Sequence, residues 1–176
     1  MMGQDWKLET PRLYIREAVA ADTDFIFELL NSANWLEYIG DRGIRTLSDA
    51  KAYIDNQLIA SYTDLGFGLY LMIEKTGQTP IGLCGFLQRD YLEHPDIGFA
   101  ISPEFEGQGY TTEAGRSMMA YGREQLGFTT ILAITTATNH GSKQVLTKLG
   151  LHPNGTVLHP VEKDELLLFT SDIPVG

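Results

Sequence analysis

Residues 102–110 read SPEFEGQGY, and this stretch decides the fold of the chain. The apolar run 96–101 before it predicts a strand, and residues 111–126 after it predict a helix. Gly107 and Gly109 have no Cβ atoms, so the backbone between the two elements can approach a ligand closely. The free N–H groups of the helix's first turn face the same space and favour an anion. The stretch therefore predicts a cradle for a pyrophosphate.

Two other phosphate-binding motifs are excluded by the same residues. No Gly-Lys-Ser/Thr follows the glycines, so the loop is not a P-loop. The three-glycine spacing of the dinucleotide-binding fingerprint is also absent. The same residues could instead form an ordinary glycine turn, with no bound ligand, before a helix that is capped by threonine. Both interpretations are compatible with the motif alone.

The elements around this stretch predict a mixed sheet. Residues 130–136 are rich in β-branched side chains and predict a strand, which a helix separates from the strand 96–101. Such a connection makes the two strands parallel in a right-handed βαβ unit. The remaining patterns predict strands at 13–17, 68–74, 81–88, 156–161 and 165–170, helices at 22–31, 46–65 and 142–149, and an apolar loop at 34–45.

About seven strands and four helices in one domain, residues 1–176, give an α+β class, or α/β in looser usage, with a mostly antiparallel sheet.

The chain has 23 acidic and 13 basic residues and a net charge of −10, which argues against a nucleic-acid partner. A single cysteine, Cys84, excludes an intrachain disulfide. No apolar run is long enough for a membrane helix, and the start is unlike a signal peptide, so we expect a cytoplasmic protein.

Three motifs together resemble one known family. They are residues 103–114 (PEFEGQGYTTEA), 139–142 (NHGS) and 146–151 (LTKLGL). The chain is similar to the GNAT superfamily of acetyl-CoA-dependent N-acetyltransferases. Its opening, residues 10–17 (TPRLYIRE), is most similar to the RimJ/RimL-like branch, whose named members acetylate the N-termini of ribosomal proteins. The resemblance runs from about Thr10 to Thr170.

The resemblance implies a GNAT-like fold, acetyl-CoA as co-substrate and a primary amine as acceptor, such as a protein N-terminus or a small amine. It implies that the glycine loop holds the pyrophosphate of acetyl-CoA and that the preceding strand pairs with the pantetheine arm. It also implies that Asn139 forms a hydrogen bond with the pantetheine amide and that Ser142 lies beside Asn139. The implied acetyl-CoA contacts are Phe99, Ala100, Ile101, Glu106, Gly107, Gln108, Gly109, Tyr110, Thr111, Thr112, Asn139 and Ser142.

The chain departs from the family pattern in two ways. Glu104 and Glu106 place carboxylates beside the expected pyrophosphate, where like charges repel. Leu146 stands where many relatives have a tyrosine that protonates the leaving thiolate. A catalytically idle module that binds or senses coenzyme A is therefore an alternative to an active enzyme.

Acetyl transfer to an amine needs a group that takes a proton and one that gives it. Asp96 is the main candidate base, because some relatives have a catalytic glutamate at this position; a strand-end carboxylate in water is its alternative reading. Glu93 and His94 are nearby alternatives. Ser142 is the candidate acid, or else the N-cap of the helix that follows it.

The remaining expectations concern the acceptor and the assembly. The aromatic side chains of Trp35 and Tyr38 either wall the acceptor site or pack on the sheet. His152 and His159 have no partner at ligand spacing, so no metal site is predicted. We expect a monomer or a homodimer, and no membrane partner.

Overall fold

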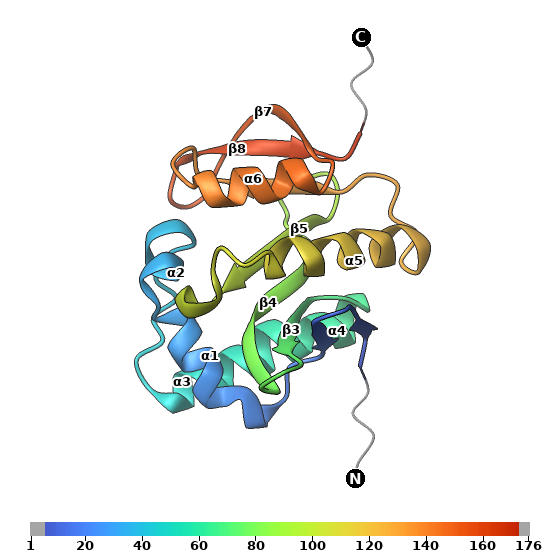
Figure 1. Ribbon diagram of the computed structural model, residues 1–176. Coiled ribbons are helices and arrows are strands. Elements are labelled where there is room, and N and C mark those ends of the chain that lie inside the picture. The colour runs from blue at the N-terminus through green and yellow to red at the C-terminus, as the bar shows by residue number, and fades with distance from the viewer. Residues whose placement is uncertain (1–5, 173–176) are drawn as a thin grey trace.

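The strand Leu69–Glu74 (β3) is apolar on both of its faces, and this decides how the sheet is covered. Tyr70 and Met72 are buried in one hydrophobic cluster, whereas Leu71 and Ile73 are buried in another. A strand that is apolar on both sides must be covered on both sides. The computed structural model, which describes residues 6–172, has helices on both faces of one sheet (Figure 1).

The sheet has eight strands among the described residues, in the order β1-β2-β3-β4-β5-β6-β8-β7. All neighbours are antiparallel except β5 and β6, which are parallel. Besides β3, the strands are β1 (Leu8–Glu9), β2 (Leu13–Arg16), β4 (Thr79–Leu87), β5 (Asp96–Ile101), β6 (Leu132–Thr135), β7 (His152–Leu158) and β8 (Glu165–Thr170).

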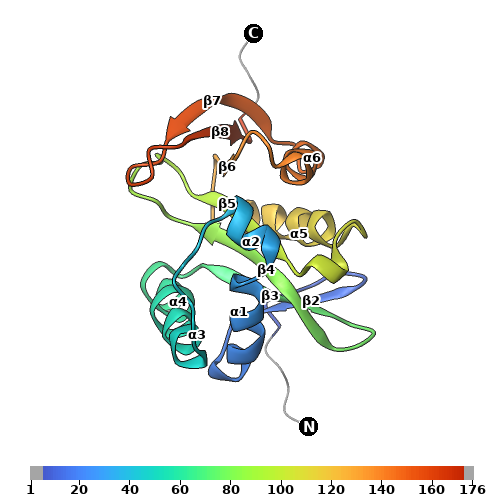
Figure 2. The same cartoon turned by 90° about the vertical axis from the view of Figure 1, so that its left-hand side faces the viewer.

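The helices divide between the two faces of the sheet. One face is covered by α5 (Tyr110–Glu124) and α6 (His140–Lys148), whose buried side chains join the cluster that contains Met72. The other face is covered by the helices between β2 and β3 (Figure 2). Their buried side chains pack against Leu71. These are α1 (Thr23–Leu30), α2 (Ala33–Tyr38), α3 (Leu47–Tyr53), a π-helical segment (Ile54–Ile59) and α4 (Ala60–Leu65).

The sequence-based prediction of a mixed sheet with one parallel junction is confirmed, and β5 and β8 have the predicted bounds. Three details were wrong. β1 adds a short strand at the edge of the sheet. Residues 34–45 are not all loop, because α2 forms there around the buried Trp35. The strand predicted at 156–161 instead spans His152–Leu158 (β7); within it, Gly155 adopts a positive φ and the register with β8 shifts, so Asn154 and Gly155 form an irregularity within the strand.

Candidate active site

A cleft opens where β5 and β6 separate. The two strands share one pair of residues in register, Asp96 and Leu132, and no strand among residues 6–172 lies beside the rest of β5 on that side. The cleft has a volume of about 1070 Å³ and is lined by β5, the glycine loop, α2 and the start of α6. This volume suits a ligand at the large end of the usual range.

The backbone of β5 offers hydrogen-bonding groups to this cleft. The Ser102 N–H donates to the Ile81 carbonyl of β4, whereas the Pro95 carbonyl accepts from the Leu132 N–H at the start of β6. Successive residues of a strand direct their backbone groups to opposite neighbours. The N–H and C=O groups of Phe99 and Ile101 therefore face the cleft, and those of Ala100 face β4. Of the three residues predicted to contact the pantetheine arm, two present backbone groups to the cleft.

The glycine loop lies at the carboxyl end of β5, against the first turn of α5. Gly107 and Gly109 have φ values of 73° and 83°, in the left-handed region that other residues rarely adopt. The N–H groups of residues 110–112 open the helix and have no acceptor among residues 6–172. The ring of Tyr110 is buried against Phe105, so only its backbone is available to a ligand. Free donors thus converge at this end of the cleft, as the sequence predicted.

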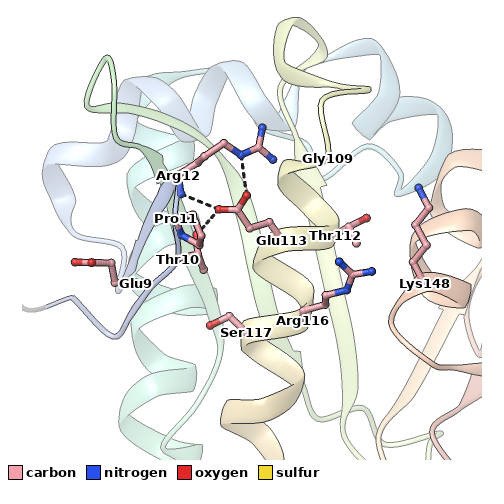
Figure 3. Close-up of a pocket in the computed structure, with 10 residues that line it drawn as sticks. All are labelled: Glu9, Thr10, Pro11, Arg12, Gly109, Thr112, Glu113, Arg116, Ser117 and Lys148. Carbon is pink, nitrogen blue, oxygen red and sulfur yellow. Dashed lines mark hydrogen bonds and ion pairs between the residues drawn. The ribbon is translucent and has the colours of Figure 1, made fainter.

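A network that the sequence analysis missed holds this loop (Figure 3). The Arg12 guanidinium donates to the Gln108 carbonyl at 3.0 Å, pairs with Glu113 at 2.7 Å and lies 4.1 Å from the centre of the Tyr110 ring. Glu113 also accepts from the Thr10 hydroxyl. Burial alone would raise the pKa of Glu113, but the hydrogen bonds from Thr10 and Arg12 outweigh it and lower that pKa. The start of β2 therefore fixes the loop and the first turn of α5 together.

Beside the loop, a second cavity of about 640 Å³ contains two further cations that the sequence analysis also missed. Arg116 on α5 and Lys148 on α6 extend into the space next to Thr112 (Figure 3). Neither makes an ion pair within the described part of the chain. Thr112 and Arg116 are four residues apart, which places them on one helix face. This spacing could have indicated from the sequence that Arg116 lies beside the glycine loop.

Asn139, and not Ser142, is the N-cap of α6. The Asn139 Oδ1 accepts from the Ser142 N–H at 3.1 Å, so the reading of Ser142 as the cap is wrong. The side-chain NH2 group of Asn139 and the hydroxyl of Ser142 make no hydrogen bond with residues 6–172, and both residues line the cleft. Leu146 also lines it but is only 1% exposed.

Asp96 lies at the other end of β5 from the glycine loop. Its side chain is 1% exposed, so the reading of a carboxylate in water is wrong. Both of its oxygens lie 3.1 Å from the Arg89 Nε. Burial raises the pKa of Asp96 to about 6 despite the positive charge of Arg89. Asp96 lines the cleft, whereas Glu93 and His94 do not.

The side of the cleft that the sequence predicts to hold the acceptor is formed by α2 and the segment after it. Trp35 and Tyr38, the two predicted wall residues, both line the cleft. The carboxylate of Glu106 accepts a hydrogen bond from Asn34, which connects the glycine loop to α2. Arg42 and Arg89 line the same side, and the sequence analysis assigned no role to either.

The part of the chain that the structure describes contains no group of three or more His, Cys, Asp or Glu side chains that could hold a metal ion. Within residues 6–172, no helix combines the length and apolar character that crossing a membrane requires.

Comparisons with known proteins agree with this geometry. The acetyltransferase (GNAT) domain family matches residues 12–152. The N-acetyltransferase YnaD of Bacillus subtilis strain 168 is 27% identical over 149 residues, which cover 84% of each chain. The structure of RimL, a ribosomal L7/L12 alpha-N-protein acetyltransferase in complex with coenzyme A, superposes with a TM-score of 0.80 at 14% identity, covering 96% of this chain and all of that one. A GNAT-family acetyltransferase from Bacillus anthracis superposes with a TM-score of 0.77 at 19% identity, covering 93% of this chain and 96% of that one.

The family match spans most of the chain and includes the glycine loop, the free edge of β5 and the start of α6. The chain therefore belongs to the GNAT acetyltransferase family and is an N-acetyltransferase.

Proposed function

We propose that this enzyme transfers an acetyl group from acetyl-CoA directly to a primary amine, with both substrates bound at once. The observation that carries the proposal is that one cleft holds the free edge of β5 and the free N–H groups of α5, and also reaches the aromatic side chains of α2. The likeness in fold to RimL supports a protein or peptide α-amine as one class of acceptor, with small amines as the other.

The residues present fit acetyl-CoA. The N–H groups of residues 107–112 would hold the pyrophosphate, the backbone of Phe99 and Ile101 would pair with the pantetheine arm, and the Asn139 amide would donate to it. Arg116 and Lys148, which make no ion pair with a described residue, add positive charge to the cavity beside the loop. The bound thioester supplies an activated acetyl group.

The transfer forms a C–N bond, breaks a C–S bond and moves one proton from nitrogen to sulfur. Asp96 is suited to take the proton through a water molecule, because its pKa of about 6 leaves it ionised at neutral pH. Ser142 has a free hydroxyl on the wall formed by α6 and is suited to protonate the thiolate. The N–H group of Phe99 or Ile101 would polarise the carbonyl.

Release of free thiol tests this function against the alternative of an idle coenzyme A-binding module. We expect amine-dependent release of thiol from acetyl-CoA on a panel of peptides and small amines. Ser142→Ala should lower turnover by about tenfold, the low end of the general-acid range or below, because a thiolate of pKa about 8.5 leaves fairly well unaided. The Michaelis constant for acetyl-CoA should change less. Unchanged turnover in Ser142→Ala would remove the serine from the chemistry, and no release with any amine would favour the idle module.

Asn139→Ser separates binding of coenzyme A from capping of the helix. Serine is a good N-cap, so the unfolding temperature should stay near that of the wild type, but the amide donor is lost. We expect the dissociation constant of coenzyme A to rise by about five- to tenfold, as expected for loss of one hydrogen bond of about 1 kcal/mol. Isothermal calorimetry measures it, with Asn154→Ser in β7, outside the cleft, as the control. Equal affinity in the wild type and Asn139→Ser would contradict this role.

The raised pKa of Asp96 predicts that kcat/KM changes with pH near the pKa of this carboxyl group. A base that must be ionised loses activity as pH falls through its pKa, here about 6. An α-amine acceptor of pKa about 8 must also lose its proton, so the logarithm of kcat/KM should rise with a slope of two below about pH 6 and a slope of one from there to about pH 8. Asp96→Asn should lower kcat/KM and leave a slope of one at all pH values below about 8. A slope of two in Asp96→Asn would assign the lower limb to another group.

A further inference from the structure

Two arginines converge on the acceptor side of the cleft. Arg42 follows α2 and Arg89 follows β4, and both line the cleft together with Tyr53 of α3. Burial raises the pKa of Tyr53, and the charges of Arg42 and Arg89 both act to lower it. The two arginines thus line the same cleft as Tyr53, although they lie 47 residues apart in the sequence.

These two charges are incompletely neutralised. Arg89 directs its Nε to Asp96 and its Nη1 to the Tyr91 hydroxyl at 3.3 Å, but its Nη2 donates to nothing among residues 6–172. Arg42 makes no ion pair with a described residue. The other carboxylate that lines the cleft belongs to Glu106, at the opposite end of β5. The acceptor side therefore has a net positive charge in a protein whose overall charge is −10.

The walls around the arginines add apolar surface and one further donor. Trp35, Tyr38 and Tyr53 surround this side of the cleft. The indole N–H of Trp35 is buried and has no acceptor within the described residues. A second ammonium group on the acceptor would be repelled here, because like charges at close range are unfavourable. A carboxylate would instead accept from the free guanidinium groups.

We propose that the acceptor amine carries a carboxylate, which binds between Arg42 and Arg89 while an apolar part of the molecule packs on Trp35 and Tyr38. This inference rests on the proposed function, since it concerns the second substrate of the same cleft. Two sources have this chemistry: a free amino acid, and a peptide whose N-terminal residue has an acidic side chain. The cleft thus selects against basic peptides, which the acidic surface alone would favour.

Binding of acetylated products tests the proposal without turnover. N-acetyl-phenylalanine has the proposed carboxylate, and N-acetyl-phenylalaninamide is the same molecule without the charge. We expect the acid to bind to the wild-type protein at least tenfold more tightly than the amide, as measured by chemical-shift titration. Arg42→Ala should abolish this difference. Arg123→Ala is the matched control, because Arg123 is an exposed arginine at the end of α5 that lines neither cavity, and it should preserve the difference.

A third ligand, N-acetyl-aspartyl-alaninamide, identifies the source of the carboxylate. Tighter binding of this ligand than of N-acetyl-phenylalanine points to an acidic peptide, and the reverse points to a free amino acid. Equal binding of acid and amide, binding of neither, or a preference that survives Arg42→Ala would overturn the proposal. Calorimetry with coenzyme A on the same samples separates the two claims, since loss of coenzyme A binding would contradict the proposed function and leave the carboxylate preference standing.

Discussion

The separation of β5 from β6 is the constraint on which the rest of this structure depends. A strand in the middle of a sheet normally uses both sets of backbone groups, and leaving one set without partners in an apolar interior is costly. In this protein the two strands share one register pair, and β5 leaves its partner immediately after Asp96. The groups of Phe99 and Ile101 thus remain available, and a ligand with alternating donors and acceptors can pair with them as a strand would.

The rest of the fold holds this open edge in place. On one side, β5 is anchored to β4 along its whole length. At its carboxyl end, Arg12 and Glu113 tie β2 to the glycine loop, so that the free N–H groups of α5 start where β5 ends. At its amino end, the pair of Arg89 and Asp96 occupies the point where β5 and β6 meet. The cleft therefore has a glycine-loop end, proposed to bind the pyrophosphate, and an opposite end, proposed to bind the acceptor, separated by roughly 17 Å of strand.

The strand, the glycine loop and the helix start at one end of the cleft could be predicted from the sequence, because they depend on local backbone rules. A strand, two glycines and a helix start are all visible within residues 96–112, and Asn139 was recognised from a motif. The acceptor end could not be predicted in the same way. Arg42, Tyr53 and Arg89 come from three separate segments, and only the packing of α2 and α3 against the sheet brings them together. The burial of Asp96 was missed for the same reason, since the strand that pairs with it, β6 at Leu132, is distant in sequence.

Amide hydrogen exchange at single residues shows whether coenzyme A pairs with the free edge of β5. On addition of coenzyme A, we expect slower exchange at the N–H groups of Phe99 and Ile101 and at residues 110–112. Ala100 is an internal control, because its N–H faces β4 and is protected before the ligand binds. Equal changes at Phe99, Ala100 and Ile101, or no change at Phe99 and Ile101 when coenzyme A is bound, would show that the free edge of β5 is not the binding surface.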